Sequence, residues 1–288
     1  MEYSQFEKAI KEGNLEQVQF LIEPLLLASE PDTQYEIAEM LVGTGYLKEA
    51  DQILQHIQFL FPNEAQIKID RAHLLMEIDQ EDEALLLLSS IEPHEDEYPQ
   101  ALLSLADYYQ MQGFYEAAEQ RINQALDLMP DEPLLKFAKA ELMLETGKYL
   151  EAVRLYEELK RDQDEIASIR LSERLAEVLT AGAAYEEALP YYEESLEHHV
   201  TPDLLFGYAH AAFQAEQFEL AIRKLTEVKT LDPDYFSAHL LLAQSLMMIE
   251  ENERAYEAIT EGLSRDEYDK ELYLFAGKLA LKLGKTKE

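Results

Sequence analysis

The sequence contains no cysteine and no tryptophan among its 288 residues. Without cysteine it cannot form a disulfide framework, a thiolate metal site or a cysteine nucleophile. No run of about 18 or more apolar residues occurs, so we expect no transmembrane helix. The first residues, MEYSQFEKAIKEGN, are charged and amphipathic and resemble neither a signal peptide nor a transit peptide. We therefore expect a cytoplasmic protein with no membrane partner.

Positive charge is also scarce. The chain has 24 Lys and Arg against 59 Asp and Glu, which gives a formal net charge of −35. A surface of this sign repels the phosphates of nucleic acids and of anionic lipids. It favours basic or neutral partners and keeps the chain in solution. We therefore expect no nucleic-acid partner.

The residue patterns that carry catalysis are missing as well. None of the seven histidines falls in an HExxH motif or in a zinc-ligand spacing. The residues Gly284, Lys285 and Thr286 match the end of a phosphate-binding loop, but Leu279 occupies the place of its first glycine. The carboxylates are numerous, and no pair stands out as a general acid and base. We predict no catalytic residue, no metal site and no cofactor, and hence a protein that is not an enzyme.

Instead, the sequence contains a repeat, seen most clearly over residues 99–132. This stretch contains two amphipathic helices, with Leu102 and Leu105 on one face of the first and Ile122 and Ala125 on one face of the second. Gly113 separates the helices. A helix pair of this size cannot bury both of its faces alone, so it needs similar pairs on either side.

Small residues repeat at two positions of this unit with the same spacing. The steps in both series are 34, 34, 34, 36, 33 and 34, and the first series adds a final step of 34. Small side chains are expected where two helices cross closely. Position 8 is occupied by Ala38, Ala72, Ala106, Ala140, Ala176, Ala209, Ala243 and Gly277, and position 20 by Ala50, Ala84, Ala118, Ala152, Ala188, Ala221 and Ala255.

This pattern resembles the tetratricopeptide repeat, a 34-residue helix pair with small residues at positions 8 and 20 and a proline at position 32. Aromatic residues also recur at position 17, and the closing proline is present in three units, although the tryptophan typical of position 4 is absent. The resemblance implies an all-α fold, an α-solenoid that forms a right-handed superhelix of about eight helix pairs and a terminal helix. The residues concerned are Tyr115, Tyr149, Tyr185 and Phe218, and Pro62, Pro130 and Pro233.

The whole chain is predicted to form one array of repeats. The step of 36 places two extra residues at or near residues 161–168 and predicts a local change of superhelical twist between Lys160 and Val200. Pro24 should kink or stop its helix, and Pro190 should kink its helix if it lies beyond the first turn. The last helix either caps the array or ends the sequence because a longer repeat protein was cut there. We favour the second interpretation. The expected units are 1–30, 31–64, 65–98, 99–132, 133–168, 169–201, 202–235, 236–269 and a partial unit at 270–288.

In this family the first helix of each unit lines a concave groove, which implies a set of candidate binding residues. Most units carry a large apolar residue at position 5, and several carry an acid at position 9. This combination suits a basic or amphipathic segment of a partner protein, although position 5 can equally serve ordinary packing. The candidates are Tyr35, Glu39, Ile69, His73, Leu103, Asp107, Phe137, Glu141, Arg170, Arg174, Glu177, Phe206, His210, Phe213, Leu240 and Gln244.

Arg170 and Arg174 permit two interpretations. In one subset of the family, basic residues at their positions form half of a clamp for a partner's terminal carboxylate, but the other half is missing here. Alternatively, they pair along their own helix with Glu173 and Glu177. We favour this pairing.

The sequence thus predicts a non-enzymatic interaction scaffold or adaptor. The alternative within the family is a regulatory protein that senses a short peptide, or an adaptor in regulated proteolysis or signalling. The identity of the partner and the oligomeric state are not encoded in any motif that we recognise.

Overall fold

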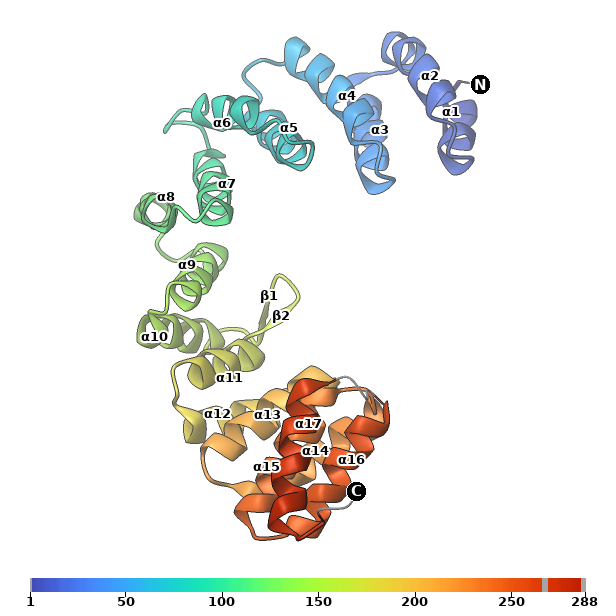
Figure 1. Ribbon diagram of the computed structural model, residues 1–288. Coiled ribbons are helices and arrows are strands. Elements are labelled where there is room, and N and C mark those ends of the chain that lie inside the picture. The colour runs from blue at the N-terminus through green and yellow to red at the C-terminus, as the bar shows by residue number, and fades with distance from the viewer. Residues whose placement is uncertain (1, 266–268, 286–288) are drawn as a thin grey trace. The chain divides into compact units, whose positions relative to one another are not determined.

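The computed structural model describes residues 2–265 and 269–285, and the chain divides into two compact units, residues 1–135 and 136–288. The N-terminal unit is entirely helical in its described part (Figure 1). Its helices form four consecutive pairs, which are α1 (Glu2–Lys11) with α2 (Leu15–Ala28), α3 (Pro31–Gly43) with α4 (Leu47–Leu60), α5 (Ala65–Glu77) with α6 (Glu81–Ser89), and α7 (Tyr98–Met111) with α8 (Tyr115–Leu128).

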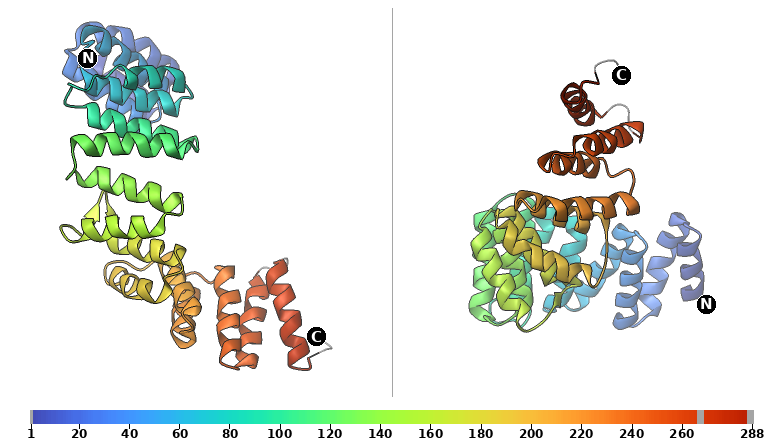
Figure 2. Two further views of the ribbon diagram at one scale, coloured as in Figure 1. Left: turned by 90° about the vertical axis from the view of Figure 1, so that its left-hand side faces the viewer. Right: turned by 90° about the horizontal axis from the view of Figure 1, so that it is seen from below.

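The C-terminal unit continues the same pattern after the division, which falls within the first turn of α9. Its successive helices lie side by side in two further views (Figure 2). Its elements are α9 (Pro133–Glu145), α10 (Tyr149–Lys160), β1 (Glu165–Ile166), β2 (Ile169–Arg170), α11 (Leu171–Ala181), α12 (Tyr185–Leu196), α13 (Pro202–Gln214), α14 (Phe218–Leu231), α15 (Phe236–Met248), α16 (Asn252–Arg265) and α17 (Lys270–Lys282). The predicted all-α solenoid of eight helix pairs and a further helix is confirmed for the described residues.

The two series of small residues lie where the helices pack most closely. Every alanine of both series is at most 1% exposed. Leucine and isoleucine side chains from the same helices fill the core beside them, for example Leu41 and Ile53 of the N-terminal unit. Gly277 on α17 differs, because a Cβ atom placed there would meet no atom within 4 Å.

The first helix of every pair, and the last helix α17, end in the same turn. One residue of each turn has a positive φ, and the residue after it donates its backbone N–H back into the helix, as Phe114 does to the Tyr109 carbonyl at 2.8 Å. This is the Schellman arrangement that favours glycine. From Gly45 onwards, the steps between these residues reproduce those of the two alanine series. They are Gly13, Gly45, Asp79, Gly113, Gly147, Ala183, Glu216, Glu250 and Gly284.

The two extra residues of the irregular repeat are part of a β-hairpin between α10 and α11. Glu165 pairs with Arg170, and Ile166 pairs with Ile169. The two residues between the strands, Ala167 and Ser168, both have positive φ angles, as a type I′ turn requires. The predicted position of the extra residues is confirmed, whereas strand pairing was not predicted. The expected boundary between residues 168 and 169 falls inside this hairpin.

The two internal prolines do not end their helices. Helix α2 continues past Pro24 to Ala28, so of the two predicted outcomes, a kink or a stop, the stop does not occur. Pro190 is the sixth residue of α12, beyond the first turn, and this helix continues to Leu196. Buried residues on both sides of each proline explain the result, since tertiary packing holds the flanking turns in place.

Polar side chains join neighbouring helix pairs across the apolar core. Arg71 on α5 is 4% exposed, and its guanidinium donates to Asp51 Oδ1 at 2.7 Å, Gln58 Oε1 at 2.9 Å and Glu83 Oε1 at 2.6 Å. The first two acceptors belong to α4 and the third to α6. A buried cation with three acceptors fixes the mutual positions of these helices, and removing one partner would leave a charge without its hydrogen bond.

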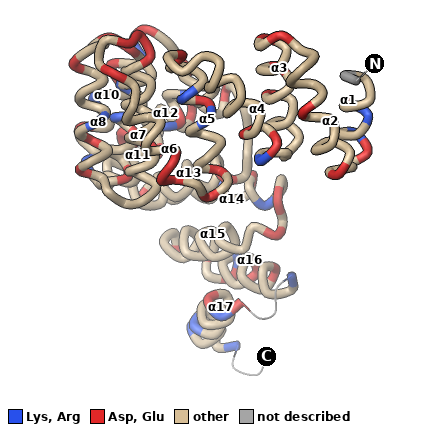
Figure 3. Tube along the Cα trace, turned by 90° about the horizontal axis from the view of Figure 1, so that it is seen from above, with Lys and Arg blue, Asp and Glu red and all other residues tan. Residues whose placement is uncertain are grey.

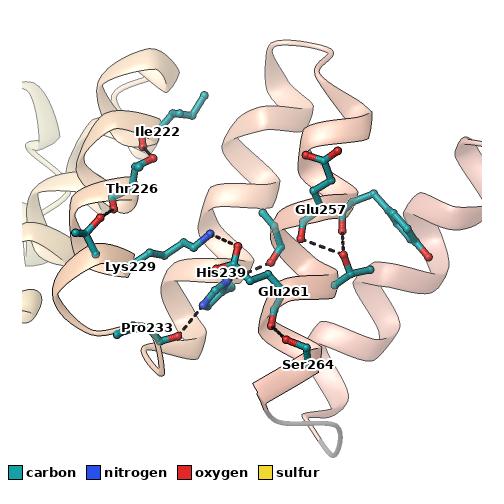
Figure 4. A network of polar contacts seen from close by, with 12 residues as sticks. Ile222, Thr226, Lys229, Pro233, His239, Glu257, Glu261 and Ser264 are labelled. Carbon is teal, nitrogen blue, oxygen red and sulfur yellow. Dashed lines mark hydrogen bonds and ion pairs between the residues drawn. The ribbon is translucent and has the colours of Figure 1, made fainter.

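A second network joins α14, α15 and α16 (Figure 4). Lys229 Nζ donates to Glu261 Oε2 at 2.6 Å. The imidazole of His239 is fully buried and lies between two backbone oxygens, with Nε2 2.9 Å from the Pro233 oxygen and Nδ1 3.2 Å from that of Ala258. Gly262 provides the space for this ring, because a Cβ there would lie 3.1 Å from the Cβ of His239.

We predict that Glu216→Gly stabilises the protein by about 1 kcal/mol, because glycine removes the steric cost of the left-handed conformation at φ 58°. Urea denaturation would measure the gain. The matched control is Gly113→Ala, at φ 75°, where an added Cβ meets nothing within 4 Å and only the backbone is tested. It should destabilise the protein by a similar amount. Equal midpoints for Gly113→Ala and the wild type would contradict this account.

We predict that Gly262→Ala destabilises the protein by about 1–3 kcal/mol, because the new methyl group collides with His239 and Leu272. The comparison variant is Gly277→Ala, a glycine inside α17 with open space around it, which should be neutral or stabilising by up to about 1 kcal/mol. Thermal unfolding of both variants would test the difference. Equal changes in Tm would show that the packing around His239 does not limit the size of residue 262.

Candidate partner-binding surface

The structure divides the predicted binding residues into three groups by exposure. Ile69 and Phe137 are buried, 0% and 6% exposed, so they pack in the core and have no surface to offer a partner. The exposed candidates are Glu39, His73 and Asp107. The half-buried candidates are Tyr35, Leu103, Glu141, Arg170, Arg174, Glu177, Phe206, His210, Phe213, Leu240 and Gln244.

Several of these residues join the first helices of successive pairs. Tyr35 on α3 donates its hydroxyl to Asp70 on α5 at 2.5 Å. His73 on α5 lies with Nε2 2.7 Å from Ser104 Oγ on α7. These contacts hold neighbouring first helices in register, so part of the predicted surface also supports the array.

The surroundings of Asp107 change the acidity of its carboxyl group. Desolvation raises the pKa of its carboxyl, and the nearby charge of His73 acts in the opposite direction. A carboxylate that loses part of its water shell gains from contact with a cation.

Arg174 is already neutralised within the molecule. Its Nε lies 3.1 Å from Glu141 Oε1, and its Nη1 lies 2.7 Å from Glu177 Oε2. Glu141 also accepts a hydrogen bond from the buried Tyr156, and burial together with this hydrogen bond raises the pKa of that phenol. The pairing with Glu177 that we favoured from the sequence is present. The additional partner, Glu141 of the preceding pair, was not predicted.

Arg170 lies where the hairpin meets α11. It is half-buried beside a hollow of about 520 Å³ whose lining also includes Glu165, Glu173 and His199. His199 lies 3.3 Å from Glu173, which therefore has a partner other than the helix neighbour that we expected. The acids in this lining limit its use as a clamp for an anion.

Aromatic candidates of the C-terminal unit pack against their neighbours. The rings of Phe206 and Tyr235 are 5.0 Å apart, and Tyr235 donates its hydroxyl to Asp203 at 2.9 Å. Burial and this hydrogen bond raise the pKa of Tyr235 to about 12. Phe213 contacts Phe218 at 5.6 Å between ring centroids. These contacts leave only part of each ring for a partner.

A hollow of about 440 Å³ in the N-terminal unit combines apolar and acidic groups. Pro99, Leu103, Met129, Leu134 and Leu135 supply its apolar surface. Among the sequence-predicted residues it contains only Leu103. Its other lining residues are Gln66, Asp96, Glu97, Gln100 and Glu132.

The sequence analysis did not predict most of the residues that line this hollow. One feature of the sequence could have indicated them. Met129 and Leu134 stand at the end of one helix pair and the start of the next, where they are 42% and 43% exposed. Leu60, Phe61 and Leu128 are also large apolar residues near such joints and more than 40% exposed. Apolar residues at the joints between units are thus the feature that could have indicated it.

In residues 2–265 and 269–285, no group of three or more His, Asp or Glu is placed to hold a metal ion. No helix in these residues is long and apolar enough to cross a membrane.

Comparison with known proteins identifies the family. The family model described as "YpiA-like, tetratricopeptide repeats" matches residues 110–164, and the one described as "Tetratricopeptide repeat" matches residues 173–236. The TPR repeat-containing protein YpiA of Bacillus subtilis (strain 168) is 38% identical over 251 residues. The chain belongs to the tetratricopeptide-repeat family. The match covers 87% of this tetratricopeptide-repeat chain and 59% of the length of YpiA.

Solved tetratricopeptide-repeat structures share the fold at lower identity. A C-terminal part of a TPR repeat-containing protein from Cytophaga hutchinsonii is 15% identical, with a TM-score of 0.66 over 83% of this chain and 98% of that one. YrrB, described as a TPR protein with an unusual peptide-binding site, is 20% identical, with a TM-score of 0.53 over 62% of this chain and 91% of YrrB. The part of MamA from residue 41 to its end, from Desulfovibrio magneticus RS-1, is 18% identical, with a TM-score of 0.54 over 61% of this chain and 98% of that one. Proteins built from these repeats are in general interaction scaffolds.

We predict that Asp107→Asn stabilises the tetratricopeptide-repeat array at neutral pH, because the raised pKa means that the ionised carboxylate disfavours the folded state. In the wild type, the contribution of this group to stability is greatest below the unfolded-state pKa and is lost as the pH rises through the higher folded-state pKa. The advantage of the variant should therefore shrink as the pH falls. Urea denaturation at several pH values would measure it, with Asp127→Asn on α8 as a control. An advantage that grows on acidification would contradict the prediction.

Proposed function

We propose that this chain is a non-enzymatic, cytoplasmic scaffold that binds a basic or amphipathic segment of a partner protein. The observation that supports this best is the hollow lined by Leu103, Met129 and Leu134 (with Pro99 and Leu135), because its apolar surface has Asp96, Glu97 and Glu132 beside it. The apolar surface of the hollow would remove the apolar face of a bound segment from water, and the carboxylates would attract the lysine or arginine side chains of that segment.

The charge of the rest of the chain favours the same class of partner. Acidic residues are distributed along the helices and outnumber basic ones in the tube representation (Figure 3). A field of this sign raises the encounter rate with a basic segment and lowers it for acidic competitors. It also repels nucleic acid and anionic membranes, so a protein or peptide is the partner class that we propose.

A pair of designed helical peptides would test the proposal by calorimetry. Both peptides share one apolar face, and their polar faces carry either lysine or glutamate. The lysine peptide should bind, and Leu103→Asp should weaken it at least about tenfold, since a charge in an apolar contact is poorly tolerated. Glu132→Lys should weaken it most at low salt.

The control is Leu86→Asp, which changes a leucine that is 71% exposed on α6 and lies outside the hollow's lining. It should leave the Kd unchanged. Equal affinity for the two peptides would refute the preference for basic segments. An unchanged Kd in Leu103→Asp would refute the assignment of the hollow.

A further inference from the structure

The turn between α11 and α12 is unusual in this array because it contains only glycine and alanine. It consists of Gly182, Ala183 and Ala184. Ala184 follows the left-handed residue of its turn, and in every other turn of the described chain this position holds a longer side chain. Those residues are Asn14, Tyr46, Gln80, Phe114, Lys148, Gln217, Glu251 and Lys285.

Ala183, in the same turn, has a φ of 60°, a conformation that alanine adopts only at a steric cost. It shares this feature with Asp79, Glu216 and Glu250 at the same position of three other turns, whereas the remaining five turns use glycine. Backbone strain of this kind persists where the surrounding structure enforces it and is common at functional sites.

The first consequence is an apolar hollow of about 390 Å³ on one side of the turn. Val153, Val178 and Leu179 contribute to its lining together with Gly182 and Ala184. Leu150, which also lines it, is 78% exposed. Gly182 shapes the hollow, because a Cβ there would lie 3.0 Å from the Cβ of Tyr149. The hollow is large enough for one apolar side chain of a partner.

The second consequence is an acidic hollow of about 460 Å³ on the other side, between the turns that follow α11 and α13. Glu186, Glu187 and Glu216 contribute three carboxylates to its lining. None of the three forms an ion pair within 4.0 Å with another residue of the described chain. Ala184 lines both hollows, so they meet at this alanine.

We propose that this edge of the C-terminal unit is a second docking site, which binds a segment of a partner protein that carries an apolar residue close to a lysine or arginine. The apolar side chain enters the hollow beside Val178, and the cation lies against Glu186, Glu187 and Glu216. The complementarity of charge and polarity between the two hollows fixes the direction of the segment. The site lies on the turns rather than on the first-helix residues considered above, and it does not depend on the function proposed for them.

A peptide library displayed on phage would test the proposal with the full chain as bait. The blocking variant is Ala184→Trp, which places a large side chain where the two hollows meet. Its matched control is Gln217→Trp, at the corresponding position of the next turn, which lines neither hollow. The double variant Glu186→Lys and Glu187→Lys changes only residues with solvent-accessible side chains, so it tests the site without a risk to the core. Circular dichroism and thermal unfolding would establish that each variant is folded.

We expect selection to yield peptides that combine an apolar and a basic residue and that bind the Ala184→Trp and double variants at least about tenfold more weakly. The same peptides should bind Gln217→Trp as tightly as the wild type. A selection in which Leu103→Asp weakens every peptide and Ala184→Trp weakens none would assign all binding to the hollow around Leu103 and would overturn the second site. Selection of acidic peptides, or of none that Ala184→Trp weakens, would overturn it as well.

Discussion

Close contact between helices is the constraint on which the rest of this structure depends. Two helix backbones can approach each other closely only where the facing residues are small. The alanines at the two repeated positions meet this condition in every full unit, and all of them are buried. The left-handed turn that follows each first helix then reverses the chain within a few residues, so the second helix returns along the first. The spacing of the alanines and the spacing of the turns are equal because both are consequences of one packing geometry.

The fold could be predicted from the sequence because this geometry leaves a regular pattern of residues. Ala106 and Ala118 mark the same contact as their counterparts 34 residues away, and the step of 36 marks the insertion before α11. The conformation of the insertion could not be predicted, since two strands of two residues each have no periodicity to read.

The binding surface was less predictable, because equal repeat positions are not equally exposed. Phe137 is buried whereas Leu103, at the same position of the preceding unit, is half-buried. Burial depends on which side chains the neighbouring helices present, and this information is spread over the chain. The hollow around Leu103 also needs Asp96 and Leu134, which lie in different units of the repeat and meet only in three dimensions.

The distribution of charge connects stability with partner selection. Several of the few basic residues bind acids on a neighbouring helix, as Arg71 does with Asp51 and Lys229 does with Glu261. These cations hold the array together, and the acidic excess therefore remains mostly on the surface. Any cation that a partner brings meets carboxylates that form no ion pair within the described chain, such as those of Glu187 and Glu216. A chain that uses its lysines and arginines for internal contacts gains cohesion between repeats, and the acidic surface that remains is the basis of the preference for basic partners that we propose.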